Sequence, residues 1–552
     1  MNDRILQVIP LGGLGEIGKN MTAVRQESGI LLMDAGLAFP DEEMPGIDLV
    51  LPDFSYLREH RDELRGIVLT HAHEDHVGAL PYLLREFDVP VYGTTLTLGL
   101  VRPKLAEFGI KRADLREVKA GDEIDLAGFG LELINVNHSI PDAVAVAICT
   151  NAGTIVFSGD YKIDLTPIEG EPMDLSRYAA LGREGVLAYF GDSTNSERPG
   201  YVPSESIVGE TLNEVFEKAE GRIIVASFAS HLHRVSQVVE AAKNHGRLVG
   251  VTGRSMIRNV QIARELGYLD LPQSMYVDQR DVNQVPDGDI VILTTGSQGE
   301  PLAALSRIAA GTHRSIEVGA EDTVVIAAHP IPGNERGVSR TINNLMKHGA
   351  EVLYSPLRAV HVSGHAAQEE QKLVLSLLKP KFLVPVHGEF RHLRHHANTA
   401  IGMGIPEENI FVLENGERLE FNNGEARKLD PVSAGMFLVD AGSVADTSEA
   451  IMRERQQLSE EGMFIVVARI NAQSGELLGP PDVISRGFMD QQAQNGLADE
   501  SIDVVTKTLQ RTASRRVTDW GELKNAIRRD LSGFLSQKTR KRPIILPLIV
   551  EV

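Results

Sequence analysis

The segment His71-Ala72-His73-Glu74-Asp75-His76 decides the chemistry and the fold of this chain. It follows the apolar run Gly66-Ile67-Val68-Leu69-Thr70, which predicts a buried strand, and the stretch from Val77 to Phe87 predicts a helix after it. Packing does not require three imidazoles and two carboxylates within six positions. Imidazole nitrogen and carboxylate oxygen are the usual ligands of zinc and manganese. The pattern therefore predicts two neighbouring divalent metals, with a histidine-rich surface loop as the alternative.

The composition is that of an ordinary globular protein. With 552 residues the chain is too long for a single core, so we expect two to four domains. It contains no repeat and no apolar span long enough to cross a bilayer, and Met1 to Leu6 lack the features of an export signal. The single cysteine, Cys149, excludes an internal disulfide and a cysteine-based zinc finger. We therefore expect a cytoplasmic protein without a membrane partner.

The charge of the chain is unevenly distributed. A formal net charge of −21 argues against indiscriminate binding to nucleic acid. Between Arg511 and Arg542, however, ten Lys and Arg residues accompany only three Asp and Glu residues. Such a basic end could contact phosphates, but we favour the alternative, a solvated helix face.

The pattern of apolar residues changes along the chain. Over the first two hundred residues, short strands rich in Val, Ile and Leu alternate with helices. From about residue 205 to 360, strands and helices repeat regularly, which predicts a parallel sheet with helices on both faces. The strands predicted for that sheet are Ile223–Ser227, Leu248–Val251, Ile290–Thr294 and Val324–Ala328.

The remaining residues predict a return to the first pattern, a connection and a small closing module. Residues 367–437 predict helix, strand (Phe382–Val386) and helix, and Val444–Gly462, rich in Ser, Glu and Gln, predicts a linker. The strands Met463–Ile470 and Ile544–Val550, with two helical stretches between them, predict an α/β module.

Further candidate ligands stand where apolar strands run out into turns. One loop cannot supply two metals, and strand ends are places where a rigid sheet can aim side chains at a common point. A lone histidine after a strand is usually structural, but four such polar residues beside the hexapeptide predict a joint site. These four residues are Asp34, His138, Asp160 and His387.

Taken in order, these residues resemble those of a known superfamily. The set Asp34, His71-x-His73-x-Asp75-His76, His138 and Asp160 resembles the metallo-β-lactamase superfamily, and Asp192, His365 and His387 resemble the motifs of its β-CASP branch, which processes nucleic acids. The stretches Thr294–Pro301 and Ala328–Glu335 resemble the ribonuclease J family in particular. The resemblance covers about residues 1–440, and the last hundred residues match only in length and position.

The resemblance implies a fold and its domain boundaries. The expected α/β fold is a metallo-β-lactamase αβ/βα sandwich interrupted by an inserted parallel-sheet β-CASP domain and followed by a small α/β domain. The sandwich would comprise residues 1–205 and 367–443, and the β-CASP domain residues 206–366. A linker, 444–462, would lead to the C-terminal domain, 463–552.

The resemblance also implies how the metals are held. One of two divalent ions per subunit (Zn²⁺, Mn²⁺ or both) would bind His71, His73 and His138, the other would bind Asp75, His76 and His387, and Asp160 would bridge them. Asp34 would not bind a metal itself but would orient these ligands. A structural Ca²⁺ or Mg²⁺ near Gly46, Asp48 and Asp440 is implied as well, although those residues alone do not suggest it.

The needs of phosphodiester hydrolysis, an activated water and a proton for the leaving oxygen, suggest catalytic roles for residues of this site. Asp75 or Asp160 would orient the attacking water, and Asp192 belongs to the first β-CASP motif. His365 would protonate the departing 3′-oxygen, because imidazole titrates near neutral pH. A structural histidine is the alternative for His365.

Two segments predict an anion pocket beside the metals. Ser230-His231-Leu232-His233-Arg234 precedes a predicted helix, whose N-terminus attracts phosphate. His361-Val362-Ser363-Gly364-His365 offers hydroxyl, bare backbone N–H and imidazole groups. In the ribonuclease J family the corresponding segments bind the 5′-monophosphate and the nearest nucleotides.

Two other motifs have plainer interpretations. Gly13-x-Gly15-x-x-Gly18 formally matches a dinucleotide-binding fingerprint, but the residues after it predict a returning strand, so we favour a hairpin loop. The run His392-Leu393-Arg394-His395-His396 predicts a helix face near the active site rather than a third metal site.

By resemblance, the chain is expected to be a 5′–3′ exoribonuclease that acts on 5′-monophosphate RNA, releases nucleoside 5′-monophosphates and also cuts internally, in RNA maturation and mRNA decay. Its partners would be single-stranded RNA, a second copy in a homodimer (or further copies in a tetramer) and other RNA-decay proteins. Three alternatives stay open: a hydrolase of small thioesters or lactones, a β-CASP DNA nuclease, and a catalytically silent RNA-binding paralogue. The inserted domain argues against the first, and the complete ligand set argues against the last.

Overall fold

A computed structural model describes residues 4–41, 44–300, 302–331, 334–440, 442–445, 449–474, 476–488, 491–515, 517 and 519–551. The chain forms two compact units, of which the first comprises Met1–Phe39 and Val50–Met436. The second comprises Pro40–Leu49 and Phe437–Val552. No helix among the described residues is long and apolar enough to span a membrane.

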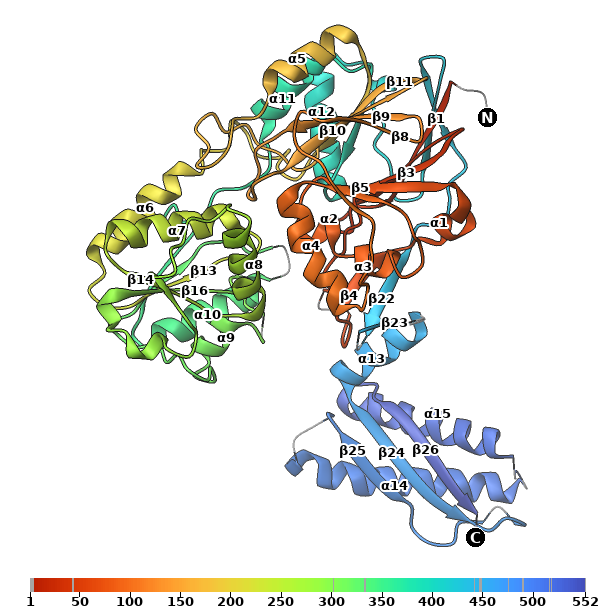
Figure 1. Ribbon diagram of the computed structural model, residues 1–552. Coiled ribbons are helices and arrows are strands. Elements are labelled where there is room, and N and C mark those ends of the chain that lie inside the picture. The colour runs from red at the N-terminus through yellow and green to blue at the C-terminus, as the bar shows by residue number, and fades with distance from the viewer. Residues whose placement is uncertain are drawn as a thin grey trace. The chain divides into compact units, whose positions relative to one another are not determined.

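Two sheets face each other in the first unit (Figure 1). The first has the strand order β21-β20-β1-β2-β3-β5-β6-β7 and the second β19-β12-β11-β10-β9-β8. Their facing sides share one apolar core, to which Leu31 and Val68 contribute from the first sheet and Val146 and Phe190 from the second. The strands of the first sheet are β1 (Ile5–Gly12), β2 (Met21–Gln26), β3 (Gly29–Met33), β5 (Leu64–Val68), β6 (Val91–Gly93), β7 (Leu115–Glu117), β20 (Arg418–Asn422) and β21 (Glu425–Leu429). Those of the second are β8 (Glu123–Leu126), β9 (Phe129–Asn135), β10 (Val144–Thr150), β11 (Gly153–Phe157), β12 (Val186–Asp192) and β19 (Phe382–Val386).

Helices cover the outer sides of both sheets, which completes the predicted αβ/βα sandwich. Successive residues of a strand point to opposite faces, so Val146 enters the shared core while Ala145 and Ala147 contact the helices. The second sheet is covered by α5 (Leu175–Glu184), α11 (Gln368–Leu378) and α12 (Phe390–Gly402). Beside the first sheet lie α1 (Ser55–Glu59), α2 (Glu74–Val77), α3 (Leu80–Leu83) and α4 (Thr95–Glu107) (Figure 1).

The sandwich is assembled from two distant stretches of sequence. Strand β19 pairs in parallel with β12, and β20 pairs antiparallel with β1. Residues after the inserted domain therefore complete both sheets. This pairing places a strand end from near residue 387 beside strand ends from the first two hundred residues.

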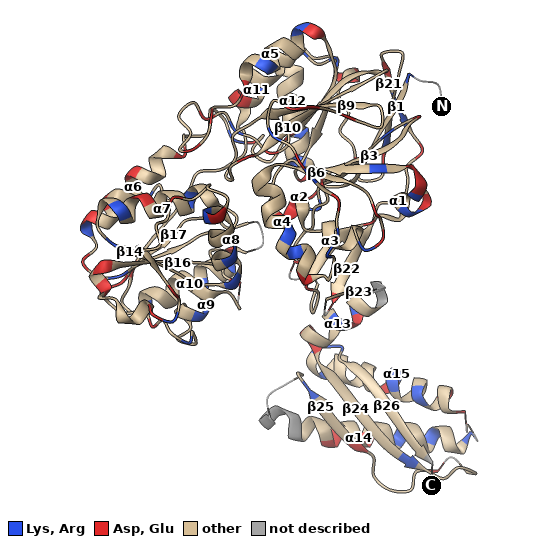
Figure 2. Ribbon diagram, viewed as in Figure 1, with Lys and Arg blue, Asp and Glu red and all other residues tan. Residues whose placement is uncertain are grey.

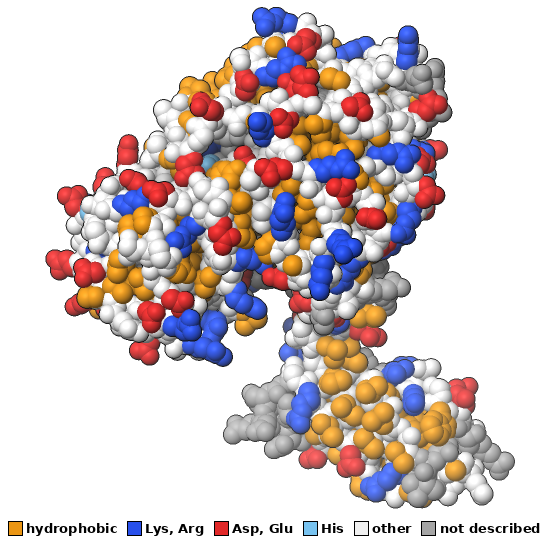
Figure 3. Space-filling view, viewed as in Figure 1, with side chains coloured by type: hydrophobic (Ala, Val, Ile, Leu, Met, Phe, Trp, Pro, Cys, Tyr) orange, Lys and Arg blue, Asp and Glu red, His pale blue; other side chains and the backbone are white. Residues whose placement is uncertain are grey.

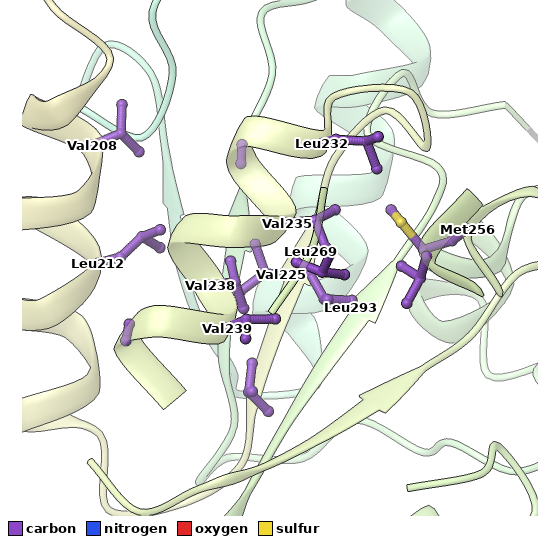
Figure 4. Close-up of a cluster of buried hydrophobic side chains, with 14 of the residues drawn as sticks. Val208, Leu212, Val225, Leu232, Val235, Val238, Val239, Met256, Leu269 and Leu293 are labelled. Carbon is purple, nitrogen blue, oxygen red and sulfur yellow. The ribbon is translucent and has the colours of Figure 1, made fainter. Parts of the chain in front are cut away.

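The inserted domain is a parallel sheet with helices on both faces, as the sequence predicts. Val225 packs with one set of helices, and its neighbours Ile224 and Ala226 pack with the other. Figure 4 shows the first of these cores, formed by α6, α7, α8 and the sheet. The elements are β13 (Ile223–Ala226), β14 (Leu248–Val251), β15 (Tyr276–Val277), β16 (Ile290–Thr294), β17 (Thr323–Ile326), β18 (Glu351–Tyr354), α6 (Ser206–Lys218), α7 (Leu232–Asn244), α8 (Arg254–Glu265), α9 (Ala304–Ala309) and α10 (Glu335–Lys347).

The second unit contains the predicted closing module. Strand β24 (Met463–Ile470) pairs antiparallel with β25 (Asp482–Arg486) and in parallel with β26 (Ile544–Glu551). Two helices, α14 (Gln491–Ser514) and α15 (Trp520–Thr539), cover one face of this sheet. Of the basic residues in this region, Arg511 lies on α14 and Lys524, Arg528, Arg529 and Lys538 lie on α15. Figure 2 shows basic residues on both helices, and three of these five pair with carboxylates, for example Lys538 with Glu500.

The predicted linker, 444–462, is mostly a helix. It contains the end of β23 (Ser443–Ala445) and the whole of α13 (Glu449–Glu461), whose Glu, Gln, Arg and Met residues favour helix. The remaining elements are β4 (Leu49–Pro52), β22 (Met436–Asp440) and short 3₁₀ helices at Arg61–Glu63, Val282–Gln284, Asp287–Asp289 and Glu407–Asn409.

The helix predicted from Val77 to Phe87 is wrong as a single element. The chain forms two short helices there, α2 and α3. A Cβ on Gly78 would lie 2.3 Å from the Leu37 side chain, so this residue must be glycine where the chain bends. Pro81 lies in the first turn of α3, where its missing N–H needs no partner, but it would interrupt a longer helix.

The glycine motif after β1 forms a hairpin loop, as predicted. Strands β1 and β2 pair antiparallel, which excludes the strand–helix unit of a dinucleotide site. Gly13, Gly15 and Gly18 all have positive φ angles, which glycine adopts without strain.

Candidate metal centre

Six strand ends of the two sheets converge at one edge. Asp34 follows β3, the hexapeptide follows β5, His138 follows β9 and Asp160 follows β11. Asp192 ends β12, and His387 follows β19. The structure therefore brings together all the strand-end residues that the sequence singles out, although 353 positions (387 − 34) separate the first from the last.

The first group of donor atoms comes from three imidazoles and a carboxylate. His73 Nδ1 lies 3.0 Å from His71 Nε2 and 3.1 Å from His138 Nε2. Asp160 Oδ2 lies 3.6 Å from His71 Nε2 and 3.7 Å from His138 Nε2. One donor atom from each of these four residues falls within 4.8 Å of the others, so they could hold one metal ion.

A second group adjoins the first and shares Asp160 with it. His76 Nε2 lies 3.2 Å from Asp160 Oδ1 and 3.7 Å from Asp75 Oδ2. His387 Nε2 lies 3.2 Å from Asp75 Oδ2 and 3.6 Å from Asp160 Oδ2. Because Asp160 belongs to both groups, its carboxylate lies between two candidate metal positions.

In four of the imidazoles, the Nδ1 atom, which points away from the donor groups, contacts a neighbouring residue. These imidazoles belong to His71, His76, His138 and His387. Asp34 Oδ2 lies 2.7 Å from His76 Nδ1, and the carbonyl of Gly364 lies 2.8 Å from His138 Nδ1. Two threonine hydroxyls do the same, Thr70 at 3.0 Å from His71 Nδ1 and Thr194 at 2.5 Å from His387 Nδ1. Such contacts fix which imidazole nitrogen faces the metal.

The sequence interpretation missed Thr70, Thr194 and Asn20, whose side-chain nitrogen lies 3.1 Å from His76 Nε2. Thr70 directly precedes the hexapeptide, and Thr194 follows Asp192 by two positions. Their place beside recognised motifs was a usable signal. Asn20 gave no such signal, because it belongs to the glycine loop.

Burial and charge divide the imidazoles into two classes. Burial lowers the pKa of His71 and His138 well below the ordinary value and that of His73 to about 4, so these rings stay neutral. Burial also opposes charge on His76 and His387, but neighbouring carboxylates, Asp160 first among them, outweigh it. They raise the pKa of His76 well above its usual range and that of His387 to about 9.

This charge balance suits a divalent metal site. Asp34, Asp75 and Asp160 gather in a largely enclosed group, and buried carboxylates require compensating positive charge. Divalent cations supply that charge and bind neutral imidazole nitrogen and carboxylate oxygen. The residues present therefore fit such ions.

His365 and Asp192 form a separate pair beside the second group. His365 Nδ1 lies 2.8 Å from Asp192 Oδ2, and the His365 side chain keeps 20% of its surface exposed. Burial opposes its charge, but Asp192 and then Asp160 outweigh burial and raise the pKa of His365. Asn195 Nδ2 donates to the His365 carbonyl and to Ser363 Oγ, both at 2.8 Å, and so holds this segment in place.

The two predicted pocket segments lie together beside the metal centre. The rings of His231 and His361 are 6.0 Å apart, and Gly364 contacts His138. Ser230 and Ser363 are half-buried, whereas Val362 and His233 are buried.

Two side chains of the first pocket segment point into the protein instead of the pocket. Leu232 is part of the apolar core, and the fully buried Arg234 pairs with Glu205 and donates to the Val360 carbonyl. A direct contact between Arg234 and a phosphate, which the sequence predicts, would require breaking this buried pair. Arg234 therefore connects the first pocket segment to Glu205 and to Val360, the residue before the second segment.

The residues predicted to hold a structural cation are engaged by an arginine. Arg455 pairs with Asp440, and its Nη1 lies 3.4 Å from the carbonyl oxygens of Pro45 and Gly46. The Asp48 N–H donates to the Val439 carbonyl at 2.8 Å. A metal at this place would have to displace the guanidinium.

Comparison with known proteins agrees with the fold. Four family descriptions match: metallo-β-lactamase superfamily (residues 14–231), ribonuclease J β-CASP domain (220–345), Zn-dependent metallo-hydrolase RNA specificity domain (351–413) and ribonuclease J C-terminal domain (450–552). The fold and the site define a member of the metallo-β-lactamase superfamily with a β-CASP insertion.

Individual relatives narrow this class. Ribonuclease J2 of Bacillus subtilis is 41% identical over 100% of this chain and 99% of the relative. Ribonuclease J of Thermus thermophilus is 42% identical over 99% of this chain and 95% of the relative. The chain belongs to the ribonuclease J family. A crystal structure of a protein of unknown function from Enterococcus faecalis V583 shares the fold, with a TM-score of 0.50 and 16% identity over 77% of this chain and 100% of that one.

Proposed function

We propose that this chain, a metal-dependent ribonuclease by family, degrades single-stranded 5′-monophosphate RNA from its 5′ end to nucleoside 5′-monophosphates and also cuts internally. Relatives named ribonuclease J support the RNA substrate. The observation that carries the proposal is the convergence of two donor groups, the His365–Asp192 pair and the two pocket segments at one edge of the sandwich. Roles in RNA maturation and mRNA decay in the cytoplasm stay predictions.

The metal centre is assigned its ligands from the two donor groups. His71, His73 and His138 would hold one ion, Asp75, His76 and His387 the other, and Asp160 both. Two divalent ions, Zn²⁺ or Mn²⁺, would supply an activated water at neutral pH and neutralise charge on the phosphate. Buried, neutral His71, His73 and His138 keep their lone pairs available for this task. Asp75 is partly exposed and is suited to orient the water.

The departing 3′-oxygen needs a proton, and we assign its donation to His365. Its partly exposed ring stands at the rim of the centre, and Asp192 stabilises the protonated form. Because Nδ1 is held by Asp192, His365 Nε2 would donate the proton and take one back from solvent, while Asp192 stabilises the imidazolium. The pair therefore restores its own acid form between turnovers.

The direction of cleavage would follow from the pocket beside the centre. Ser230, Ser363 and the backbone of Gly364 offer hydroxyl and N–H donors to a terminal phosphate. A Cβ on Gly364 would lie 2.6 Å from the His138 ring, so the backbone at this position approaches the metal ligands closely. A phosphate bound here would hold the first nucleotide against the centre.

A second copy of the chain is the proposed partner of the C-terminal sheet. Ile484, Ile465 and Leu546 line up across the three strands on the face that α14 and α15 leave open. Ile484, Leu546, Leu548 and Val550 are each 39–45% exposed, and hydrophobic side chains gather over this sheet in Figure 3. Contiguous exposed apolar side chains mark interaction sites, which supports a homodimer.

The proposal is tested with an RNA labelled at its 5′-phosphate, incubated with the full chain and Mn²⁺ or Zn²⁺. We expect labelled mononucleotide as the first product, and slower decay when the same RNA carries a 5′-triphosphate. Equal rates for the two ends would remove the pocket from the mechanism. A DNA strand of the same sequence is the control, and equal hydrolysis of it would contradict the RNA preference.

A further inference from the structure

Helix α10 carries a row of polar side chains with no partner inside the described part of the protein. Arg336, Ser339, Arg340, Asn343 and Lys347 are exposed and line a shallow surface groove. Over the described ranges, none of these side chains forms a hydrogen bond or an ion pair. We call these five residues the α10 row. At about 1.5 Å per residue, the row extends over roughly 16 Å.

The packing of the helix holds the row toward solvent. Val338, Thr341, Ile342 and Leu345 are buried on the opposite side of α10. The three apolar members of this set belong to the core that α10 shares with α9 and the parallel sheet. Figure 1 shows α9 and α10 on the face of that sheet opposite α6 and α7. Because this core fixes the rotation of the helix, the row faces outward.

The α10 row is positively charged, whereas the chain as a whole is negatively charged. The net charge is −21, and many surface cations of this protein pair with carboxylates, as Lys243 does with Asp270. The row has three cations, and the single acidic residue of α10, Glu335, lines the same groove at the first position of the helix. Cations interleaved with hydroxyl and amide groups are the side chains that contact nucleic-acid phosphates. The row is therefore suited to a phosphate backbone.

The row begins at loops that reach toward the metal centre. Gly299 packs on the first turn of α10, where its Cβ would lie 2.2 Å from the Gly337 carbonyl carbon. The neighbouring Gln298 donates to the His329 carbonyl at 2.8 Å. The His329 ring in turn lies 4.9 Å from the ring of His361, which belongs to the second pocket segment. These contacts connect the first turn of α10 to the second pocket segment, so the row begins on the pocket side of the inserted domain.

We infer that the α10 row binds the backbone of the RNA segment on the 5′ side of an internal cut. This inference rests on the proposed function, and it assigns the α10 row to internal cleavage, one of the two proposed modes of cutting. During decay from the 5′ end, the terminal phosphate occupies the pocket and no nucleotide lies beyond it. An internal cut leaves a 5′ segment on the pocket side, and the row supplies phosphate contacts for that segment.

The inference is tested with the full chain and a circular single-stranded RNA, which has no 5′ end and can only be cut internally. The variant is R336Q/R340Q/K347Q. The matched control, K119Q/R183Q/K218Q, removes three exposed positive charges elsewhere. Binding is measured by fluorescence anisotropy without divalent ions, and internal cleavage is measured with them. Hydrolysis of a 5′-monophosphate pentanucleotide is followed in parallel.

We expect the α10 variant to bind circular RNA on the order of tenfold to a hundredfold more weakly at 0.1 M salt. The slope of log K against log salt should become less steep by about 2, from roughly 0.7 for each of three contacts. Internal cleavage should fall with binding, and the pentanucleotide should be hydrolysed at the wild-type rate.

Unchanged binding, or equal loss in the α10 variant and the control, would overturn the inference. Binding to polyglutamate, an acidic polymer, is measured in the same way. If the α10 variant lost affinity for polyglutamate but not for circular RNA, the row would be a site for an acidic protein and the inference would be overturned. If the wild-type chain failed to hydrolyse the pentanucleotide, the proposed function would fall, and circular-RNA binding would still decide whether the row binds RNA.

Discussion

Asp34 Oδ2 lies 2.7 Å from His76 Nδ1, and the N–H of Thr70 donates to Asp34 Oδ1 at 2.8 Å. Asp34 adopts a left-handed backbone with φ of 57°, which is uncommon for a residue other than glycine. The carboxylate is therefore held in place from two sides and in turn sets the orientation of the His76 ring. It acts on the metal centre through His76.

Asp34→Ala should weaken metal binding about 10- to 100-fold, because His76 loses the group that orients it. The measurement is a titration of metal-free protein with Zn²⁺ or Mn²⁺, followed by calorimetry. Asp34→Asn keeps one acceptor oxygen and should lie between the wild type and the alanine variant. Unaltered affinity in both variants would show that the Asp34–His76 contact does not support the site.

His73→Ala should abolish RNA hydrolysis and leave the fold intact, since His73 Nδ1 is within 3.1 Å of both other imidazoles of its group. Activity is measured in metal-replete buffer, metal content by elemental analysis and folding by circular dichroism. His395→Ala is the control, because His395 is half-exposed on α12 and pairs with Glu197. Substantial turnover by the His73 variant would count against the two-metal assignment.

His365→Gln should slow hydrolysis of RNA by about 10²- to 10⁴-fold, the usual contribution of a general acid. A phosphodiester with a p-nitrophenyl leaving group needs no proton, so its hydrolysis should slow far less. The ratio of the two rates is the measurement. If both substrates slow equally, His365 acts by position alone and the proton-donor role is wrong.

His396 should make the protein less stable in acid. Burial lowers its folded pKa to about 4, below the unfolded value of about 6.5. The unfolded chain therefore binds a proton that the folded chain does not, and stability present above pH 6.5 is lost as the pH falls toward 4. The shift corresponds to a stability change on the order of 3 kcal/mol.

The test is urea unfolding at pH 7.5 and pH 5 with a chelator present, so that metal release contributes nothing. His396→Gln retains a partner for Ser193 Oγ, which lies 3.0 Å from His396 Nδ1. The variant should lose less stability than the wild type between the two pH values. An identical loss would show that His396 does not titrate on unfolding.

Removing residues beyond 450 should convert a dimer to a monomer, because the open face of the C-terminal sheet would be lost. L546E/L548E should do the same with the domain still present, since both side chains lie on that face. Sedimentation measures the oligomeric state. A monodisperse dimer after either change would place the interface elsewhere.

Many of the strands could be predicted because they depend on local patterns of apolar residues. The strands Leu248–Val251, Ile290–Thr294 and Phe382–Val386 agree residue for residue with the structure. Their apolar runs are short and clearly bounded. The single helix predicted after the hexapeptide was wrong for two reasons. Gly78 packs closely against Leu37, and Pro81 begins a new helix. The periodicity of apolar residues does not report either effect.

The identity of the nitrogen and oxygen donors, and their position at the ends of apolar strands, can be predicted from local sequence. Three features depend on the folded chain. Strand β19 lies beside β12, Thr70 and Thr194 contact two of the imidazoles, and Arg234 pairs with Glu205. The reason is physical. Strand and helix tendencies depend on near neighbours, whereas contacts between side chains far apart in the chain arise only when whole sheets pack against each other.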